Sequence, residues 1–483
     1  MTSVMHHLLE QIDPYRWRVP RTGDMRTDGL IFSDADMIED LRFDPAVEQV
    51  ANVAHLPGIV GPSIAMPDIH WGYGFPIGGV AAFDLEEGVI SPGGVGYDIN
   101  CGVRLLQTNL PESTVEPHLG RLMDRLYAEI PSGVGSARAD VRLNSTELDQ
   151  VMTRGVGWAI DNGFGLPADS ETMEAGGCLM DADPTEVSER ARTRGARQLG
   201  TVGSGNHFVE VGVVEQIYDQ AVADALGLSM AEVTVLIHSG SRGLGHQVCD
   251  DNLDVMVAAS TKYGISLPDK QLCCAPLSSP EAGAYWGAMN AAANFAFANR
   301  QLMTHFARSA FDTVFGAGTG KGIRVVYDVA HNIAKREWHT VGGELREVCV
   351  HRKGATRAFP PGHDELPARY SAVGQPVFIP GDMGRYSYVL VGTAGAFDET
   401  FGSTCHGAGR RLSRNAAKKA ARGRDINAEL AAQGIHVRAA SRATVMEEIS
   451  EAYKDVAKVV DVVDHAGIGR KVARLRPMGV LKG

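Results

Sequence analysis

The segment Gly94–Gly102 (GVGYDINCG) places the carboxylate of Asp98 three residues before the thiol of Cys101, within a glycine-rich, apolar stretch. On a turn or at a helix start, this spacing puts both side chains on one face, with Cβ atoms ~5–6 Å apart. A thiolate can bridge two metal ions while a carboxylate, a harder ligand, anchors one of them. The pair also fits a buried structural cysteine beside a turn-forming aspartate, so a metal site needs further ligands.

Three histidines supply ligands of the right type. His238 follows a β-branched run, His331 follows the apolar run 323–329, and His207 lies in a Gly/Ser/Asn turn that enters another apolar run. A single histidine in such a place is most often a hydrogen-bonded core residue. Three of them at strand ends, where active-site groups are commonly displayed, favour a metal site. Cysteine and histidine alone suggest zinc, whereas a mixed Asp/Cys/His set with open positions also suits manganese.

A fourth histidine, His406, lies between small residues in the sequence Cys405–Arg410 (CHGAGR). A neutral imidazole nitrogen can attack the α-phosphorus of a nucleoside triphosphate and form a phosphoramidate. The transferred group needs glycine for close approach, backbone N–H groups to hold it and a cation to neutralise its charge. Gly407, Gly409 and Arg410 have these properties. The alternative is a glycine turn with an incidental histidine.

The elements that must position these residues are short strands and longer helices. Apolar, β-branched runs predict strands over residues 80–83, 88–90, 103–106, 234–237, 323–329, 377–379 and 388–391, and another strand pair around residues 203–211. Helical periodicity predicts a helix over residues 282–311 and another beginning near His246. No internal repeat or low-complexity linker divides the chain. Since the candidate site residues span positions 98 to 406, we expect an α+β fold in which residues 1–483 form a single large intertwined domain, with mixed β-sheets surrounded by helices.

Two further segments carry glycine or charge. The run Gly316–Gly322 lacks the spacing of a phosphate loop and precedes a strand rather than a helix, so we interpret it as a flexible surface loop. The segment from Arg410 to Arg424 carries seven basic residues and no acid. Such a run is commonly a solvated face, but its place after His406 favours a track for RNA phosphates.

Composition limits the remaining classes. The 483 residues carry a net charge of −12 and are 44% hydrophobic, which is typical of a globular protein and argues mildly against a nonspecific nucleic-acid coat. No apolar run approaches the ~20 residues that a membrane span needs. The N-terminus lacks the apolar core of a secretory signal, and seven scattered cysteines do not resemble a disulfide framework. We therefore expect a cytoplasmic protein with no membrane partner.

Together these motifs resemble those of the RtcB family of RNA-splicing ligases, over nearly the whole chain. The matching strings are Met66–His70, Gly72–Gly79, Gly94–Leu106, Gly203–Phe208, His238–His246, Tyr327–Asn332, Cys405–Arg410 and Gly479–Gly483. One departure is Asp382, which stands where relatives often carry a small hydroxyl residue.

The resemblance implies a role for each matching residue. One manganese ion would be held by Asp98, Cys101 and His207, a second by Cys101, His238 and His331, and His406 would become guanylylated. The guanine nucleotide would be bound by Asn206, His207, Phe208, Val209, Glu210, His331, Asn332, Pro380, Gly381, Asp382, Met383, Ser387, His406, Gly407, Ala408, Gly409 and Lys482. Arg242 and Arg410 would contact RNA phosphate.

The implied activity is a ligase that depends on GTP and on two Mn²⁺ ions. It would join RNA with a 3′-phosphate or 2′,3′-cyclic phosphate to RNA with a 5′-hydroxyl, through a histidine-GMP and an RNA(3′)pp(5′)G intermediate, in tRNA splicing or RNA repair. An archease-type activating protein is a further partner that the resemblance suggests. Two other classes remain open: a metal-dependent cyclic-phosphate hydrolase or phosphodiesterase without nucleotidyl transfer, and an RNA-binding scaffold with a structural metal.

Overall fold

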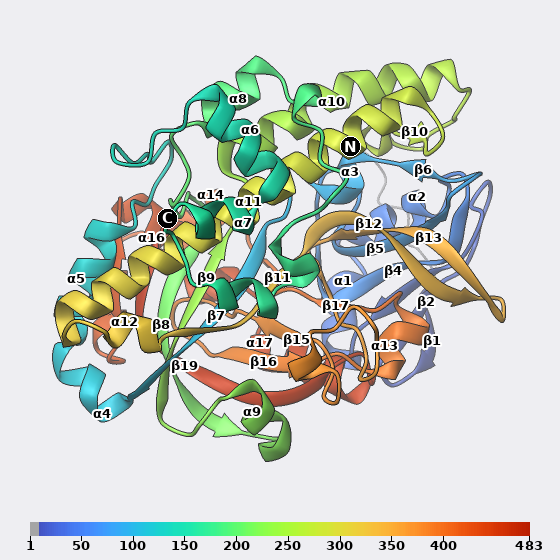
Figure 1. Ribbon diagram of the computed structural model, residues 1–483. Coiled ribbons are helices and arrows are strands. Elements are labelled where there is room, and N and C mark those ends of the chain that lie inside the picture. The colour runs from blue at the N-terminus through green and yellow to red at the C-terminus, as the bar shows by residue number, and fades with distance from the viewer. Residues whose placement is uncertain (1–8) are drawn as a thin grey trace.

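The computed structural model describes residues 9–483, in which two large mixed β-sheets are surrounded by helices (Figure 1). The first sheet has the strand order β1 (Glu10–Asp13), β2 (Arg16–Val19), β3 (Gly29–Phe32), β4 (Ile59–His70), β5 (Ile77–Asp84), β13 (Glu344–Lys353) and β12 (Asn332–Val341). Its strands pair antiparallel, except that β3 and β4 run parallel. The sheet therefore joins N-terminal strands to a hairpin from the last third of the chain.

The second sheet contains the strands that precede or follow most candidate ligands. Its order is β11 (Arg324–Ala330), β7 (Gly102–Pro111), β9 (Glu232–Ser239), β8 (Phe208–Ile217), β19 (Arg470–Lys482), β16 (Ser387–Val391) and β15 (Pro376–Ile379), with β18 (His436–Ala439) parallel to β19. Two small sheets pair β6 (Val89–Ile90) with β10 (Ala275–Pro276) and β14 (Ala355–Arg357) with β17 (Ser403–Cys405). The predicted α+β class with mixed, intertwined sheets is confirmed. The assignment of residues 1–483 to one domain stays a prediction.

Helices cover the sheets and fill the space between them. They are α1 (Ala35–Leu41), α2 (Pro45–Val53), α3 (Pro92–Val95), α4 (Glu112–Val115), α5 (Leu119–Glu129), α6 (Ser145–Arg154), α7 (Val156–Asp161), α8 (Glu189–Gly195), α9 (Gln220–Leu226), α10 (Arg242–Lys262), α11 (Pro280–Phe315), α12 (Thr319–Gly322), α13 (Ala394–Glu399), α14 (Arg414–Ala420), α15 (Ile426–Ala431), α16 (Arg442–Glu447) and α17 (Val456–His465). None of those in the described part of the chain is long and apolar enough to cross a membrane.

The long helix α11 forms the centre of the largest hydrophobic core. Its N-cap Ser279 accepts a hydrogen bond from the Ala282 N–H, and Pro280 occupies the first turn, where a missing N–H costs nothing. Alanine and phenylalanine residues on all sides of this helix are buried, as expected for a helix that packs against elements all round. The helix predicted over 282–311 is confirmed, and the structure extends it at both ends.

The glycine run before β11 is more ordered than its composition predicts. Residues Thr319–Gly322 form one helical turn, and the Gly320 N–H donates to the Asp312 carboxylate at 2.8 Å. The turn anchors the run to the end of α11, a contact that the local sequence does not indicate. As predicted, the run leads into a strand rather than a helix.

Candidate active site

One edge of the second sheet gathers side chains from distant parts of the chain. Because β11, β7, β9 and β8 are neighbours and antiparallel, the starts of β7 and β8 lie beside the ends of β9 and β11. The backbone register pairs His238 with Phe208, and Ser239 with Gly102. The candidate ligands at this edge are Cys101, His207, His238 and His331.

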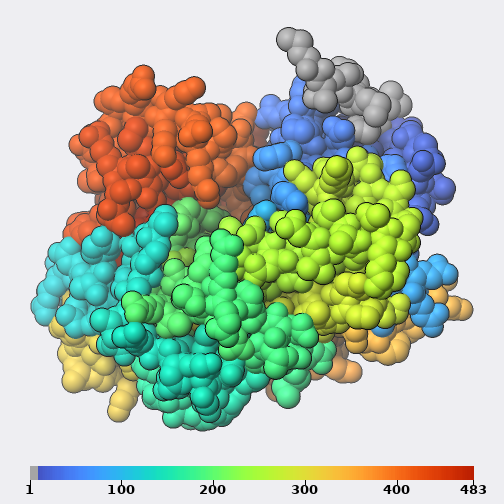
Figure 2. Space-filling view, turned by 90° about the horizontal axis from the view of Figure 1, so that it is seen from above, coloured from blue at the N-terminus to red at the C-terminus, as the bar shows by residue number. Residues whose placement is uncertain are grey.

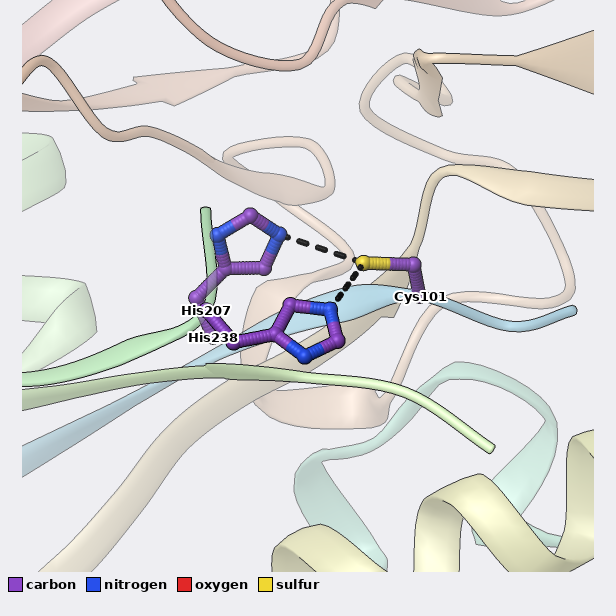
Figure 3. Close-up of side chains that lie close together, drawn as sticks. All are labelled: Cys101, His207 and His238. Carbon is purple, nitrogen blue, oxygen red and sulfur yellow. Dashed lines mark hydrogen bonds between the residues drawn. The ribbon is translucent and has the colours of Figure 1, made fainter. Parts of the chain in front are cut away.

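Cys101 lies between two of these imidazoles (Figure 3). Its Sγ is 3.3 Å from His207 Nε2 and 3.2 Å from His238 Nε2, and all three side chains are buried. The His207 Nδ1–H donates to the Val202 carbonyl at 3.1 Å, which leaves Nε2 free to bind a metal ion. The three donor atoms lie within 4.8 Å of one another, a spacing that allows one metal ion to contact all of them.

The other two predicted ligands extend this cluster on either side. Asp98 Oδ2 is 2.8 Å from His207 Nε2, and His331 Nε2 is 3.4 Å from His238 Nε2. The Cys101 N–H donates to the Asp98 carbonyl at 2.9 Å, so the two residues share the predicted turn. The structure thus brings all five predicted ligands together around the cysteine sulfur.

The electrostatics of the cluster suit a divalent cation. Burial, together with the neighbouring imidazoles, lowers the pKa of His238 and of His331 well below the usual histidine value, so both rings are neutral. Neutral imidazole is the form that binds metal. Burial and the Asp98 carboxylate raise the pKa of the Cys101 thiol well above its usual value. A bound cation would supply the positive charge that a thiolate needs there. The donor set of sulfur, nitrogen and oxygen therefore fits a divalent cation such as the manganese that the family resemblance implies.

A buried guanidinium fixes the backbone next to two of the ligands. Arg300 of α11 donates to the carbonyls of Asn100 and Ser239 at 2.8 and 2.9 Å, and it pairs with Asp328 at 2.7 Å. Asn100 adopts a left-handed conformation, with φ of 51°, which is strained for a residue with a Cβ. These contacts keep Cys101 and His238, the residues adjoining the two carbonyls, at the sheet edge.

His406 follows β17 and faces a carboxylate from β4. Its Nδ1 lies 2.6 Å from Asp68 Oδ2, and the same oxygen accepts the backbone N–H groups of His406 and Gly407 at 3.1 and 3.2 Å. Burial opposes ionisation of Asp68, but the His406 ring and these hydrogen bonds outweigh it and lower the pKa of the carboxyl. The His406 ring centroid is 4.9 Å from that of His331. With Nδ1 held by Asp68, the Nε2 of His406 remains available as a nucleophile.

Asp68 was not identified as a site residue from the sequence. It lies in the matching string Met66–His70, but no pattern in the sequence connects it with His406, 338 positions away. The available signal was a fully buried acid in the apolar run Ile64–Ile69 of β4. An acid in a buried strand needs a partner, which here is the imidazole.

We expect Asp68→Asn to slow the reaction of His406 with a nucleotide by about 100-fold, the scale associated with misplacing a reacting group by 1 Å. The negative charge of the Asp68 carboxylate orients the His406 ring and stabilises positive charge on it. An amide lacks this charge. The check is the rate at which label from α-labelled GTP becomes bound to protein. Asp36→Asn, which removes an exposed carboxylate near Lys458, is the control and should react like the unmodified protein. An unchanged rate for Asp68→Asn would show that the carboxylate does not act on His406.

A cavity of about 480 Å³ extends from the histidine cluster and His406 to the C-terminal strand. Most of the predicted nucleotide-binding residues line it: Asn206, Phe208, Glu210, His331, Asn332, Pro380, Gly381, Asp382, Met383, His406, Gly407, Ala408, Gly409 and Lys482. Val209 lies outside this lining, in the hydrophobic core, because alternate residues of β8 point to opposite faces. Ser387 also lies outside it and donates a hydrogen bond to Glu210 at 3.0 Å.

Two buried ionisable groups from neighbouring strands, Glu210 and Lys482, line this cavity. Burial raises the pKa of Glu210 to about 8, against the opposing effect of the Ser387 hydroxyl. Lys482 Nζ is 3.3 Å from Glu448 and 5.5 Å from the centre of the Phe208 ring. Lys482 lies beside Phe208 because the two residues are paired in the backbone register of β19 and β8. The cavity therefore offers an acceptor or donor carboxyl, an aromatic face and an ammonium group.

The raised pKa of Glu210 predicts a pH-dependent stability. The pKa of Glu210 is about 8 in the folded chain and 4.5 ordinarily. Between pH 4.5 and 8, Glu210 therefore holds its proton in the folded chain and loses it in the unfolded chain. The Glu210 contribution therefore disfavours folding progressively from pH 4.5 to 8, by about 1.4 kcal/mol per pH unit. Glu210→Gln should remove this contribution, so its melting temperature should rise relative to the unmodified protein as pH increases from 5 to 8. Exposed Glu189→Gln is the control, and a pH-independent difference for Glu210→Gln would contradict the assignment.

The remaining predicted residues have partners within the chain. The Asp382 carboxylate accepts from Ser450 and from the Gly384 N–H and lies 3.3 Å from Arg385. Arg242 begins α10 and donates to Thr201 at 3.1 Å, outside the cavity lining.

Arg410 lines the cavity, but protein groups hold its guanidinium. It donates to the carboxylate of Glu448 and the hydroxyl of Tyr453, both at 3.0 Å, and to the Glu447 carbonyl at 2.8 Å. Its contact with RNA phosphate stays a prediction.

The basic segment that begins at Arg410 is less positive in the fold than in the sequence. Its helix α14 covers only Arg414–Ala420, and acids from elsewhere pair with it. The pairs are Arg410 with Glu448, Arg411 with Asp40, Arg414 and Lys418 with Glu447, and Arg424 with Glu429 and Glu451. Among residues 9–483, Lys419 and Arg422 have no ion-pair partner.

Comparison with known proteins places the chain in a family. A family profile described as tRNA-splicing ligase RtcB matches residues 49–483. The chain belongs to the RtcB family. The tRNA-splicing ligase RtcB of Thermococcus kodakarensis is 54% identical over 98% of this chain and 99% of its own length. That of Archaeoglobus fulgidus is 52% identical over 99% and 100%, and the RNA-splicing ligase RtcB of Mycobacterium tuberculosis is 52% identical over 90% and 100%.

Membership of the RtcB family confirms the predicted resemblance, the fold class and the prediction of an RNA ligase. The buried Cys101, His207 and His238 cluster is compatible with metal binding. The metal identity, the nucleotide and the individual residue assignments stay predictions.

Proposed function

We propose that this RtcB-family chain is a GTP- and manganese-dependent RNA ligase that seals 3′-phosphate or 2′,3′-cyclic phosphate ends to 5′-hydroxyl ends. One observation supports the proposal most directly. His406, oriented by Asp68, lines the same cavity as Cys101, His238 and His331. A nucleophilic imidazole beside a set of metal ligands is the arrangement that nucleotidyl transfer to histidine requires.

The Asp98, Cys101, His207, His238 and His331 set would hold two Mn²⁺ ions, with Cys101 shared between them. When bound, the ions would neutralise phosphate charge and polarise the reacting phosphorus. The protein must keep the ligands in place and exclude bulk water. Cys101, His207, His238 and His331 are buried and Asp98 is partly exposed, and the contacts of Arg300 with Asn100 and Ser239 hold the backbone beside Cys101 and His238.

In the first step the Nε2 of His406 attacks the α-phosphorus of GTP. The N–P bond forms as the bond to the β-phosphate oxygen breaks, and pyrophosphate leaves. Asp68 stabilises the positive charge that develops on the ring. Glu210, which accepts a hydrogen bond from Ser387, would contact the guanine base, and Lys482 the phosphate or ribose.

In the second step an RNA 3′-phosphate oxygen attacks the phosphorus of the histidine-bound GMP. The N–P bond breaks and an RNA(3′)pp(5′)G end forms. A 2′,3′-cyclic phosphate would first be hydrolysed to the 3′-phosphate. In the third step a 5′-hydroxyl attacks the RNA 3′-phosphorus, GMP leaves, and the hydroxyl proton passes to a base or to water. The products are the sealed strand and GMP.

The family name suggests split tRNA as a substrate, with damaged RNA as the other candidate. An archease-type protein is the activating partner that we propose.

The experiment that tests the proposal is incubation of the protein with α-labelled GTP and Mn²⁺, followed by gel separation. We expect label that remains bound to the protein under denaturing conditions, that acid releases, and that passes to RNA carrying a 3′-phosphate. Bound label would oppose both other classes. No label with retained hydrolysis of a 2′,3′-cyclic phosphate would favour the hydrolase, and RNA binding without turnover would favour the scaffold.

A further inference from the structure

The cavity carries a second aromatic group besides Phe208. Tyr73, Tyr97 and His246 all line it, and their rings form a continuous series. The Tyr73 and Tyr97 ring centroids are 5.7 Å apart in an edge-on arrangement, and those of Tyr97 and His246 are 4.9 Å apart at 32°. Neither the nucleotide nor the metal assignment gives these rings a role.

These rings are accessible and lack polar partners. His246 is exposed, and the two tyrosines are half-buried. Across residues 9–483, the Tyr73 and Tyr97 hydroxyls and the His246 ring nitrogens have no hydrogen-bond partner. A tyrosine that serves only packing commonly has its hydroxyl satisfied when buried. Rings that line a cavity with free polar edges are suited to a planar ligand with hydrogen-bonding groups.

The backbone around the rings is fixed by contacts from other elements. Lys353 donates to the Tyr73 carbonyl at 2.5 Å, and the Gly74 N–H donates to Gln271 at 2.9 Å. Tyr97 lies between α3 and the metal-ligand candidate Asp98. A pre-arranged surface loses little conformational entropy when a ligand binds.

The three rings and two residues of the proposed guanosine site, Pro380 and Met383, come from different parts of the chain and line the same cavity. Figure 2 shows the blue N-terminal segments beside the yellow-green segment of α10 on one side of a hollow, with the orange and red C-terminal segments on the other. Tyr73 and Tyr97 belong to the first of these segments and His246 to α10, whereas Pro380 and Met383 belong to the C-terminal part. In the proposed second step the RNA that accepts GMP brings its 3′-phosphate to His406. Its last nucleotide therefore needs a place in the cavity that the guanosine does not fill.

We propose that Tyr73, Tyr97 and His246 form a stacking subsite for the unpaired terminal base of the RNA strand that carries the 3′-phosphate. The inference rests on the proposed function and adds how the RNA end is recognised. Aromatic side chains bind unpaired bases through their faces, with little dependence on sequence. The subsite would hold the last base while its 3′-phosphate reaches His406.

The test uses an RNA oligonucleotide with 2-aminopurine as its last base and a 3′-phosphate, titrated with full-length protein and Mn²⁺ but no GTP. Stacking quenches 2-aminopurine fluorescence. We expect quenching with the unmodified protein and with Tyr97→Phe, and loss of quenching with Tyr97→Ala together with about 5- to 100-fold weaker binding. His246→Ala alters an exposed side chain, so it gives a second variant that should fold normally and weaken binding in the same direction.

The matched control is Tyr127→Ala, which removes a tyrosine that is 37% exposed and lies outside the cavity lining. Its binding and quenching should equal those of the unmodified protein. Unchanged quenching in both Tyr97→Ala and His246→Ala would overturn the inference. If 2-aminopurine were quenched only when it is placed in the RNA strand with the 5′-hydroxyl, the assignment to the 3′-phosphate strand would be overturned. Because GTP is omitted, failure of guanylate transfer would leave this measurement unaffected, and the two failures can be distinguished.

Discussion

Replacing His406 by alanine is expected to eliminate protein-bound label from α-labelled GTP and to reduce RNA sealing by at least about 1,000-fold, because no other group replaces a covalent nucleophile. His331, whose ring centroid is 4.9 Å away, is directed at the metal cluster and cannot take its place. The measurements are label retained on a denaturing gel and the rate of joining of two RNA strands.

The same variant offers a sharper test with RNA that already carries the RNA(3′)pp(5′)G end. The last step needs the metal ligands and the RNA subsites but not the imidazole nucleophile. We therefore expect His406→Ala to join this activated strand to a 5′-hydroxyl strand. Failure to join it would show that His406 has a role beyond the covalent step. Retained label in His406→Ala would place the nucleophile elsewhere and refute the mechanism.

Cys101→Ser is expected to lower manganese affinity by at least about 100-fold, since loss of partners outside the ligand shell alone costs about 10- to 100-fold. The sulfur lies 3.3 and 3.2 Å from two imidazoles, and a serine hydroxyl is both shorter and much less acidic. Unlike the His406 variant, this one should fail with activated RNA as well, because the proposed mechanism needs the two cations both for guanylylation and for sealing. Titration of Mn²⁺ followed by calorimetry measures the affinity without reference to catalysis.

Cys178→Ser provides the control for this substitution. Cys178 is a partly buried thiol that contacts the Thr153 carbonyl, outside the cavity lining. Its manganese affinity and its labelling by GTP should match those of the unmodified protein. If Cys101→Ser bound two Mn²⁺ ions as tightly as the unmodified protein, the shared-ligand assignment would be wrong.

The sequence indicated that the predicted metal ligands would lie together, because strand ends can be located from short-range patterns. Apolar runs that stop at His238 and His331 mark the ends of β9 and β11, and antiparallel pairing brings these ends to one sheet edge. The predicted turn between Asp98 and Cys101 is likewise local.

Contacts between distant segments could not be predicted in this way. The pairing of Asp68 with His406 depends on how β4 and β17 approach each other, which no local pattern encodes. The basic segment after His406 was interpreted from its own residues alone. The acids that pair with it include Asp40, Glu447 and Glu448, which lie outside that segment. The raised pKa of Glu210 similarly arises from burial among elements far along the chain.

The place of β19 in the second sheet has a consequence for biosynthesis. Residues 470–482 are translated after every other strand of that sheet, yet β19 lies in its interior, between β8 and β16. Until this last segment leaves the ribosomal exit tunnel, both neighbours present unpaired edges, which are prone to association with other chains. The order of synthesis therefore leaves one edge of β8 and one edge of β16 uncovered until β19 is available to pair with both.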